Sequence, residues 1–277
     1  MNKSSKLAKF LIRTFLLIFA VIQIFPLYWL FMFSFKSNKE IFGGNIIGLP
    51  KEWLWENYRI AASGGDLLSY FSNSILVTTV TVILTITLAT MASYAITRLK
   101  WKLSKTVLNF FLLGIMIPLH AALLPLFLVL RNLNILNTYF ALIIPYSAFN
   151  LPIAIFIFTG FFETIPREME ESALIDGCNI YKMFSKIMIP LMKPAIATVA
   201  IFIYLATWNE LMFAVIFINK QKFMTLPVGM MSLVSKYRTE WGPIGASLVF
   251  AVLPSIIIYM ILSKRVQESI RAGAIKG

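Results

Sequence analysis

Long apolar runs separated by short polar segments make up almost the whole chain. A run of about 20 apolar residues is long enough to cross a hydrocarbon core of about 30 Å as a helix. Six runs reach that length, and they cover residues 10–35, 71–97, 106–130, 139–162, 195–218 and 244–263. The pattern therefore predicts an all-α polytopic membrane protein with six transmembrane helices.

Composition supports this class. Hydrophobic residues make up 59% of the 277 positions and charged residues 13%, whereas soluble domains are about 25% charged. We expect one membrane domain over residues 1–277, with a core at about 70–263, an N-terminal helix at 10–35 and a C-terminal tail at 264–277. The single cysteine, Cys178, and the single histidine, His120, exclude a disulfide framework and a His-rich metal cluster, so we expect no metal site.

Basic residues are distributed unequally along the chain. The net charge of +13 would suggest nucleic acid in a soluble protein. In a membrane protein it is typical of cytoplasmic loops beside anionic lipid, so we predict membrane lipid, and no nucleic acid, as a partner. If the segments between the runs face alternate sides, sixteen Lys and Arg fall on one side and nine on the other. The positive-inside bias then places both termini in the cytoplasm.

Two longer segments fall on the side opposite the termini. Residues 36–70 carry Trp53 and Trp55, which suit a membrane–water interface. Residues 219–243 form either a plain connector or a surface that meets an extracellular partner. Prolines in or beside five of the six runs indicate either ordinary irregularity of membrane helices or bent, mobile elements that line a path.

A polar segment interrupts the apolar pattern at residues 163–194, where five of the twelve acidic residues lie. Gly177 can adopt the left-handed conformation that ends one helix, and Asn179 can cap the next. Apolar residues then recur at helical spacing and predict one apolar face, formed by Ile180, Met183, Phe184, Ile187 and Met188. We expect a two-helix elbow on the cytoplasmic side. It could lie on lipid, but acids beside anionic headgroups are unfavourable, so its composition favours a protein partner.

The order of residues in this segment is distinctive. The run Glu171-Ser-Ala-Leu-Ile-Asp176-Gly177-Cys178 is followed by Phe184, Ile187, Ile189-Pro190-Leu191 and Pro194. This series resembles the EAA loop of permease subunits of bacterial ABC importers, whose pattern is EAAxxDGAxxxxxFxxIxLPLxxP. Ser172 and Cys178 stand where alanine is usual, and both are small.

Further short motifs that resemble those of the same family occur in order along nearly the whole chain. They are Pro26 with Ser34-Phe-Lys36, Asn73-Ser74, Tyr94-Ala95 with Arg98, Trp208-Asn-Glu210, Thr225-Leu-Pro-Val-Gly229, Trp241-Gly242 and the tail from Ala272 to Gly277. Together they resemble the carbohydrate-uptake branch, and most of all the second, shorter permease subunit of maltose-type importers. The resemblance implies a single type-1 ABC transporter transmembrane domain in the bacterial cell membrane, whether inner or plasma membrane.

The resemblance implies a transport protein with partners rather than an enzyme. It would translocate a sugar or oligosaccharide delivered by an extracellular solute-binding protein. It would pair with a second, homologous permease subunit and with two cytoplasmic ATPase subunits. The chain has no GxxxxGK[ST] phosphate loop, so the ATPase subunits would bind ATP and Mg²⁺ and this chain would hold no cofactor.

The resemblance also assigns residues to sites. The elbow would be a coupling helix that docks on an ATPase subunit through Glu170, Glu171, Ala173, Asp176, Gly177, Phe184 and Pro190. The loop before the sixth span would meet the binding protein through Thr225, Leu226, Pro227, Val228 and Gly229. The tail would reach along the ATPase pair through Gly273, Lys276 and Gly277.

One acidic residue, Glu210, lies within the fifth predicted span, where an ionisable group is costly and indicates a function. With Trp208 and Asn209, it could line the translocation path by binding sugar hydroxyls. It could instead be a polar lock between helices. Asn150 and Tyr146 allow the same two interpretations.

Two alternatives stay open for the function. An importer for another solute, such as a peptide or a polyol, would belong to the same class. A secondary transporter that works alone is disfavoured, because the chain has neither inverted repeats nor several carboxylates within its spans. We expect the choice of sugar to rest largely with the binding protein and the other permease subunit.

Overall fold

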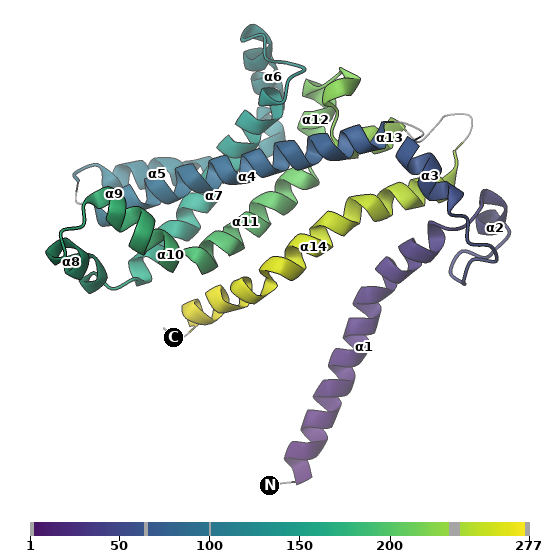
Figure 1. Cartoon of the computed structure of the whole chain (residues 1–277), viewed down its shortest axis with the longest axis horizontal. Helices are drawn as coiled ribbons and strands as arrows, with labels where there is room; N and C mark the ends of the chain where they lie inside the picture. Colours follow the sequence, from purple (N-terminus) through teal and green to yellow (C-terminus); the bar gives the residue numbers. More distant parts are fainter. Residues whose placement is uncertain (1–2, 64–65, 100, 233–238, 275–277) are drawn as a thin grey trace. The chain divides into compact units, whose positions relative to one another are not determined.

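The computed structural model describes the backbone of residues 3–63, 66–99, 101–232 and 239–274, which is helical nearly throughout (Figure 1). No strand occurs in these ranges, so the all-α prediction is confirmed for them. The chain divides into two compact units. One is Met1–Leu68 with Gly229–Leu253, and the other is Ser69–Val228 with Pro254–Gly277.

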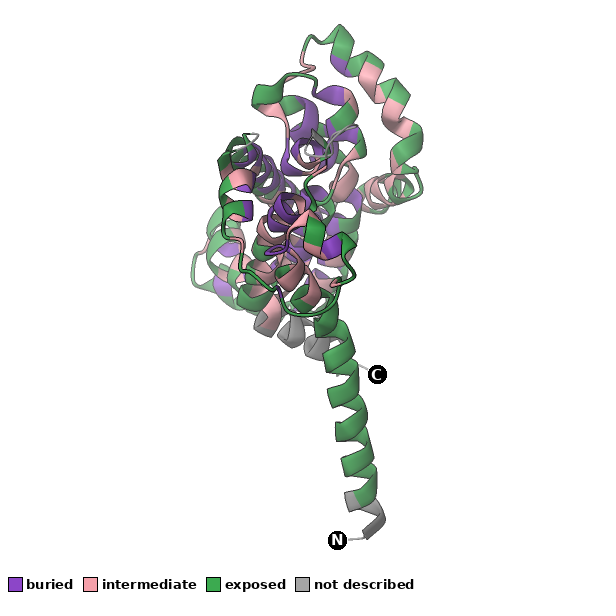
Figure 2. Cartoon of the chain, turned by 90° about the vertical axis from the view of Figure 1, so that its right-hand side faces the viewer, coloured by how far each residue is buried: buried purple, intermediate pink, exposed green. Residues whose placement is uncertain are grey.

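The first unit contains α1 (Lys3–Phe33), α2 (Asn38–Phe42), α3 (Glu56–Ser63) and the first part of α14 (Trp241–Ala274). The side chains of α1 are apolar and exposed along most of the helix (Figure 2). A helix that is apolar on all sides and exposed suits contact with lipid.

A buried turn follows α1. Phe35 packs against three aromatic rings, with centroids 5.0, 4.8 and 5.0 Å away, which are those of Trp53, Trp55 and Tyr58. The next residue, Lys36, is fully buried. Burial lowers the pKa of Lys36, and the negative charge of Glu40 opposes that shift. This turn holds the connection between α1 and α3 in place.

The second unit contains most of α4 (Leu67–Arg98) together with α5 (Ser104–Ile115), η1 (Leu119–Ala122), α6 (Leu123–Asn132), α7 (Phe140–Thr164), α11 (Lys193–Trp208) and α12 (Met212–Phe217). Two apolar clusters fill it. One surrounds Ile155 and Phe158 of α7 and includes residues of α4 and α11. The other surrounds Tyr146 of α7 and Phe213 of α12. α7 contributes to both clusters and is the central helix of the unit.

Four of the six predicted spans are continuous helices that are long and apolar enough to cross a membrane. They are Leu7–Phe33, Leu67–Arg98, Phe140–Thr164 and Trp241–Ser263. The third and fifth predicted spans are not continuous helices. The third is broken, because Ser104–Ile115 and Leu119–Asn132 meet at 91°. Just before the fifth, Ile180–Leu191 and Lys193–Trp208 meet at 74°. If each bent pair is one span, the residues that the structure describes contain up to six spans by length and composition.

The break in the third span has a local cause. Pro118 has no backbone N–H with which to continue α5, and that helix ends at Ile115. Proline alone does not break a helix in this protein, because Pro145 and Pro152 lie inside the unbroken helix α7.

The fifth span ends early, since α11 stops at Trp208 and a new helix starts at Met212. The Glu210 carboxylate accepts the N–H groups of Phe213 and Ala214, at 2.9 and 3.3 Å. A carboxylate that satisfies the free N–H groups of a first turn starts a helix. Glu210 therefore lies at a break between helices and not within a continuous span.

The predicted tail at 264–277 is largely helical, because α14 continues to Ala274. Gly273 lies in this helix. Lys276 and Gly277 lie outside the described residues.

Candidate functional site

The first helix of the polar segment, α8 (Glu168–Ile175), ends at a glycine elbow as predicted. Gly177 has a φ of 76°, which lies in the left-handed region that glycine adopts readily. The N–H of Cys178 donates to the carbonyl of Ala173 at 2.9 Å, and the N–H of Gly177 donates to that of Leu174 at 3.0 Å. These are the two bonds of a Schellman motif, so the direction of the chain after α8 is fixed.

The second helix, α9 (Ile180–Met183), begins at the predicted cap, where Asn179 Oδ1 accepts the N–H of Lys182 at 2.9 Å. It continues as a π-helical turn, η2 (Phe184–Met188), and then as α10 (Ile189–Leu191). A π turn brings residues five apart into line, and Met183 and Met188 are both buried. The predicted apolar face is confirmed at these two residues, whereas Ile180 is exposed.

The predicted coupling residues differ in exposure. The exposed ones are Glu171, Asp176, Gly177 and Pro190. Glu170 and Phe184 are half-buried, and Ala173 is buried. The exposed residues can meet a partner, while the others hold the shape of the elbow.

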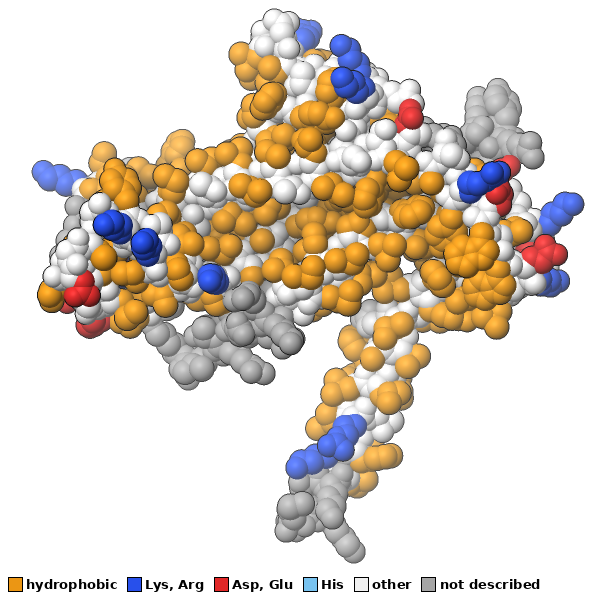
Figure 3. Space-filling model, in the orientation of Figure 1, with side chains coloured by type: hydrophobic (Ala, Val, Ile, Leu, Met, Phe, Trp, Pro, Cys, Tyr) orange, Lys and Arg blue, Asp and Glu red, His pale blue; other side chains and the backbone are white. Residues whose placement is uncertain are grey.

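Four apolar side chains beside the elbow are also exposed, and we call them the elbow surface. Ile175 is 86% exposed and Tyr181 80%, and the other two members are Leu174 and Ile180. Figure 3 shows apolar side chains exposed among charged ones at this end of the second unit. Exposed apolar groups rimmed by polar ones mark an interaction site. Sequence reasoning missed Ile175 and Tyr181, because their exposure follows from the geometry of the elbow and not from helical spacing.

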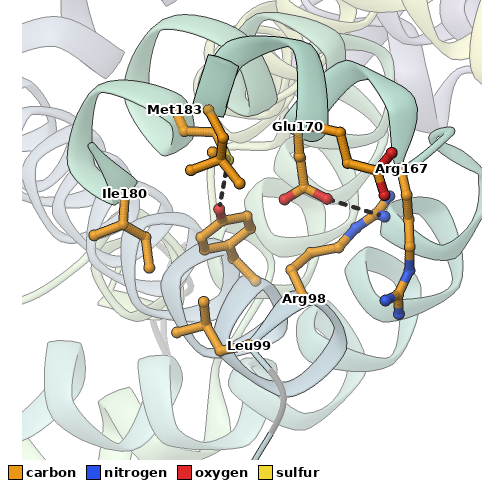
Figure 4. Close-up of a pocket in the computed structure, with 9 residues that line it drawn as sticks. Arg98, Leu99, Arg167, Glu170, Ile180 and Met183 are labelled. Atoms are coloured by element: carbon orange, nitrogen blue, oxygen red, sulfur yellow. Dashed lines mark hydrogen bonds and ion pairs between the residues drawn. The ribbon is translucent and has the colours of Figure 1, made fainter. Parts of the chain in front are cut away.

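A buried ion pair ties the polar segment to the end of α4 (Figure 4). Nη1 of Arg98 lies 3.2 Å from Oε2 of Glu170, and the two side chains are only 5% and 13% exposed. Nη2 of Arg98 donates to the carbonyl of Ile165 at 2.5 Å and also to that of Phe162. One guanidinium therefore joins α4, the end of α7 and α8.

Tyr94 makes a parallel connection one turn earlier on α4. Its hydroxyl donates to Sδ of Met183 at 3.4 Å, and its ring lies 5.1 Å from that of Phe184. Both Tyr94 and Arg98 line a cavity of about 240 Å³, whose wall also includes Arg167 and Glu171. Arg98 thus holds the first half of the elbow, and Tyr94 holds the second.

Replacing Arg98 by methionine is expected to lower the melting temperature, because Glu170 and two carbonyls lose their donor. Removing one partner of a buried pair costs about 3–5 kcal/mol. Glu170→Met alone leaves the guanidinium without its carboxylate, and the double variant is expected to recover part of the loss. Thermal unfolding of the four proteins measures this coupling. Strictly additive losses would contradict a stabilising pair.

A second cavity, also of about 240 Å³, has walls from α5, α7 and α11. Its polar lining comes from Tyr146, Asn150, Thr207 and Glu210. The Thr207 hydroxyl is buried and has no hydrogen-bond partner among the residues that the structure describes. From the sequence, Tyr146, Asn150 and Glu210 could be path residues or parts of a lock between helices. The sequence gives no sign of Thr207, since one hydroxyl in an apolar helix is common.

Glu210 uses both carboxylate oxygens within the chain. Oε2 accepts the Tyr146 hydroxyl at 2.5 Å and the N–H of Ala214, while Oε1 accepts the N–H of Phe213. The residue therefore caps α12 and joins it to α7. Of the two interpretations of Glu210, this geometry favours the lock.

Trp208 and Asn209 do not line this cavity. Trp208 is buried and stacks on Tyr204, with ring centroids 5.5 Å apart. The Asn209 amide donates to the carbonyl of Leu205 at 2.8 Å. These contacts stabilise α11 and its end, and they put neither side chain on the wall of the cavity.

The segment predicted to meet a binding protein is not a loop. From Leu226 onward, its residues belong to a short helix, α13 (Leu226–Ser232). Pro227 is half-buried, and the other four residues, Thr225, Leu226, Val228 and Gly229, are buried. The N–H of Leu226 donates to the Ser74 hydroxyl at 2.8 Å, and Asn73 donates to the carbonyl of Met224 at 2.9 Å. These bonds to α4 draw the segment inward. Between α12 and this segment, four consecutive residues are exposed, namely Asn219, Lys220, Gln221 and Lys222.

Residues 82–272 match the family of binding-protein-dependent transport system inner membrane components. The chain is 34% identical over 263 residues to the diacetylchitobiose uptake system permease protein NgcG of Streptomyces coelicolor, covering 94% of this chain and 87% of that protein. It is 30% identical over 266 residues to the arabinooligosaccharides transport system permease protein AraQ of Bacillus subtilis, covering 95% and 94%.

The fold is also similar to a solved structure. A chain in the crystal structure of a bacterial ABC transporter involved in the import of the acidic polysaccharide alginate matches with a TM-score of 0.82. The two chains are 23% identical, and the match covers 95% of this chain and 98% of that one. At this identity, the likeness shows a shared fold and carries nothing about the substrate.

Proposed function

We infer the function of this chain from the family to which it belongs, the binding-protein-dependent transport system inner membrane components. The chain is a permease subunit of a bacterial ATP-binding-cassette importer that translocates a sugar or oligosaccharide. It lies in the bacterial cell membrane, and it is a transport protein and not an enzyme. A solute-binding protein delivers the substrate to it.

In the proposed assembly, this chain pairs with a second, homologous permease subunit. Two cytoplasmic ATPase subunits bind ATP and Mg²⁺ and dock on the permeases. Both termini and the elbow face the cytoplasm, which the unequal division of Lys and Arg between the two sides supports. The extension of α14 to Ala274 supports a helical tail that continues toward the ATPase pair.

The elbow surface is the observation that carries the coupling proposal. Ile175 and Tyr181 present apolar area that nothing in the second unit covers. Beside them, the carboxylates of Glu171 and Asp176 are exposed and can pair with basic groups that rim an apolar groove. We propose that this surface docks into such a groove on an ATPase subunit.

Docking transmits motion only if the elbow is rigidly joined to the membrane helices. Arg98 and Tyr94 provide that connection, since both lie on α4 and together they hold α8, α9 and the end of α7. A displacement of the elbow by the ATPase would therefore move α4 and α7. Arg98 is a positioning residue in this proposal.

The cavity beside α7 is the proposed part of the translocation path. Tyr146, Asn150 and Thr207 present hydroxyl and amide groups there, which suit the hydroxyls of a sugar. Apolar side chains such as Phe149 and Ile153 form the rest of the wall and can contact the carbon faces of a sugar ring.

Reconstitution tests this function. The chain, the second permease and two ATPase subunits in liposomes are expected to take up sugar only when ATP and the cognate binding protein are both present. A panel of neutral oligosaccharides, a polyol and a peptide identifies the substrate class. Uptake by this chain alone, driven by an ion gradient without ATP, would overturn the proposal.

A further inference from the structure

The segment that follows α1 places apolar side chains beside the end of a membrane helix. Lys9 and Arg13 lie near the start of α1, and its apolar stretch then runs to Phe33. Because about 20 helical residues cross the hydrocarbon core, a helix that enters after Arg13 leaves it near Phe33. The chain then turns back at Lys36 and returns toward α1.

A hydrogen bond fixes the depth of this returning segment. Nε1 of Trp29 donates to the carbonyl of Ile46 at 3.0 Å. Trp29 lies about one turn, or about 6 Å along the helix axis, before Phe33. The Ile46 carbonyl therefore lies level with the last turn of the part of α1 that crosses the membrane.

Non-helical backbone does not lie exposed to lipid inside the hydrocarbon core, so at such a depth its polar groups must be paired within the protein. Nζ of the buried Lys36 donates to the carbonyls of Asn45 and Ile46, at 2.8 and 3.1 Å. The Asn45 amide donates to Glu40 at 2.6 Å and to the carbonyl of Leu49 at 2.9 Å. The N–H of Lys51 donates to the same Glu40 oxygen at 2.8 Å. The segment thus satisfies many of its own polar groups.

Several apolar side chains of the segment are exposed. Phe42 is 73% exposed, Ile47 61% and Leu49 62%, and Ile46, Trp53 and Trp55 are exposed too. Figure 3 shows apolar side chains over this end of the first unit, with charged ones at its margin. Lys39, Lys51 and Glu52, all exposed, are the charged residues next to these apolar ones in the sequence. Tryptophan and lysine are the side chains that gather at the level of lipid headgroups.

We propose that residues 42–55 form a membrane anchor in the leaflet at the Phe33 end of α1, with Phe42, Ile47 and Leu49 inserted among lipid acyl chains. In the orientation proposed above, this is the outer leaflet. The apolar side chains of the end of α1 and those of the anchor are exposed in the same unit, and the Trp29–Ile46 hydrogen bond holds the two segments together. The carbonyls of Asn45, Ile46 and Leu49 already have donors from the protein, which contact with lipid requires.

Spin-label accessibility tests the anchor in the assembled transporter, in vesicles of phosphatidylcholine and phosphatidylglycerol. A nitroxide is attached at Ile47→Cys in a Cys178→Ala background, with Leu49→Cys as a second site. Arg59→Cys is the control, because Arg59 lies on the exposed face of α3 in the same unit. The ratio of collisions with oxygen to collisions with a water-soluble nickel complex is expected to be at least about fivefold higher at 47 and 49 than at 59.

Each other result would overturn the anchor. Free collision with the nickel complex at positions 47 and 49 would place the segment in water. Weak collision with both reagents would mean that protein covers it, and a change on adding the binding protein would identify the cover. The measurement needs no transport, so it is independent of the proposed substrate and of coupling.

Discussion

Replacing Ile175 by aspartate is expected to reduce ATP-driven uptake by about 100-fold, with little change in the amount of protein in the membrane. Ile175 is 86% exposed, so the fold does not depend on its side chain. Burying an isoleucine in an interface contributes about 1.5–3 kcal/mol, and an aspartate there must also lose its hydration. Since about 1.4 kcal/mol is tenfold in affinity, a loss of about two orders of magnitude follows.

The matched control is Met169→Asp on the same helix. Met169 is exposed as well, but six residues separate it from Ile175, which turns it about 120° around the helix axis. The measurements are retention of the ATPase subunits on tagged permease and ATP-driven uptake with the cognate binding protein. If both variants retain the ATPase subunits equally well, the docking surface lies elsewhere.

Local sequence chemistry predicted the elbow correctly. A glycine that takes a positive φ and an asparagine that caps the next helix act on their own neighbours, so Gly177 and Asn179 could be assigned from the sequence. The four continuous spans were predictable for a similar reason. An apolar run long enough to cross a membrane is a property of the run itself.

The remaining features depend on partners distant in sequence. Glu210 breaks the fifth span by capping α12, and its hydroxyl partner is Tyr146, 64 residues away. Most of the segment 225–229, predicted as an exposed loop, is buried, and Ser74, 152 residues from Leu226, accepts the Leu226 N–H. Arg98 matched a family pattern, yet only the structure shows that it holds the ends of two other helices. Apolar spacing along one helix contains no information about such contacts.

The lock at Glu210 leads to a second large expected effect. Glu210→Ala removes the acceptor of three hydrogen bonds, from Tyr146, Phe213 and Ala214. Hydrogen bonds to a charged group contribute about 1.5–3 kcal/mol each. The three bonds together contribute roughly 5–9 kcal/mol. At about 2 °C per kcal/mol or more, the melting temperature of the assembled transporter is therefore expected to fall by at least roughly 10 °C. Glu210→Gln keeps one acceptor and is expected to lose less.

Asn150 provides the comparison that distinguishes a lock between helices from a path residue. Asn150 lines the same cavity, but its amide donates only to the carbonyl of Tyr146, one turn away on its own helix. Asn150→Ala is therefore expected to raise the KM for the sugar several-fold and to leave the melting temperature nearly unchanged. Uptake kinetics and thermal unfolding of both variants separate the two roles. If Glu210→Gln instead raises the KM strongly and leaves the melting temperature unchanged, Glu210 is a path residue. The reason is that weakening a contact between helices must lower the stability of the protein before it changes the affinity for substrate.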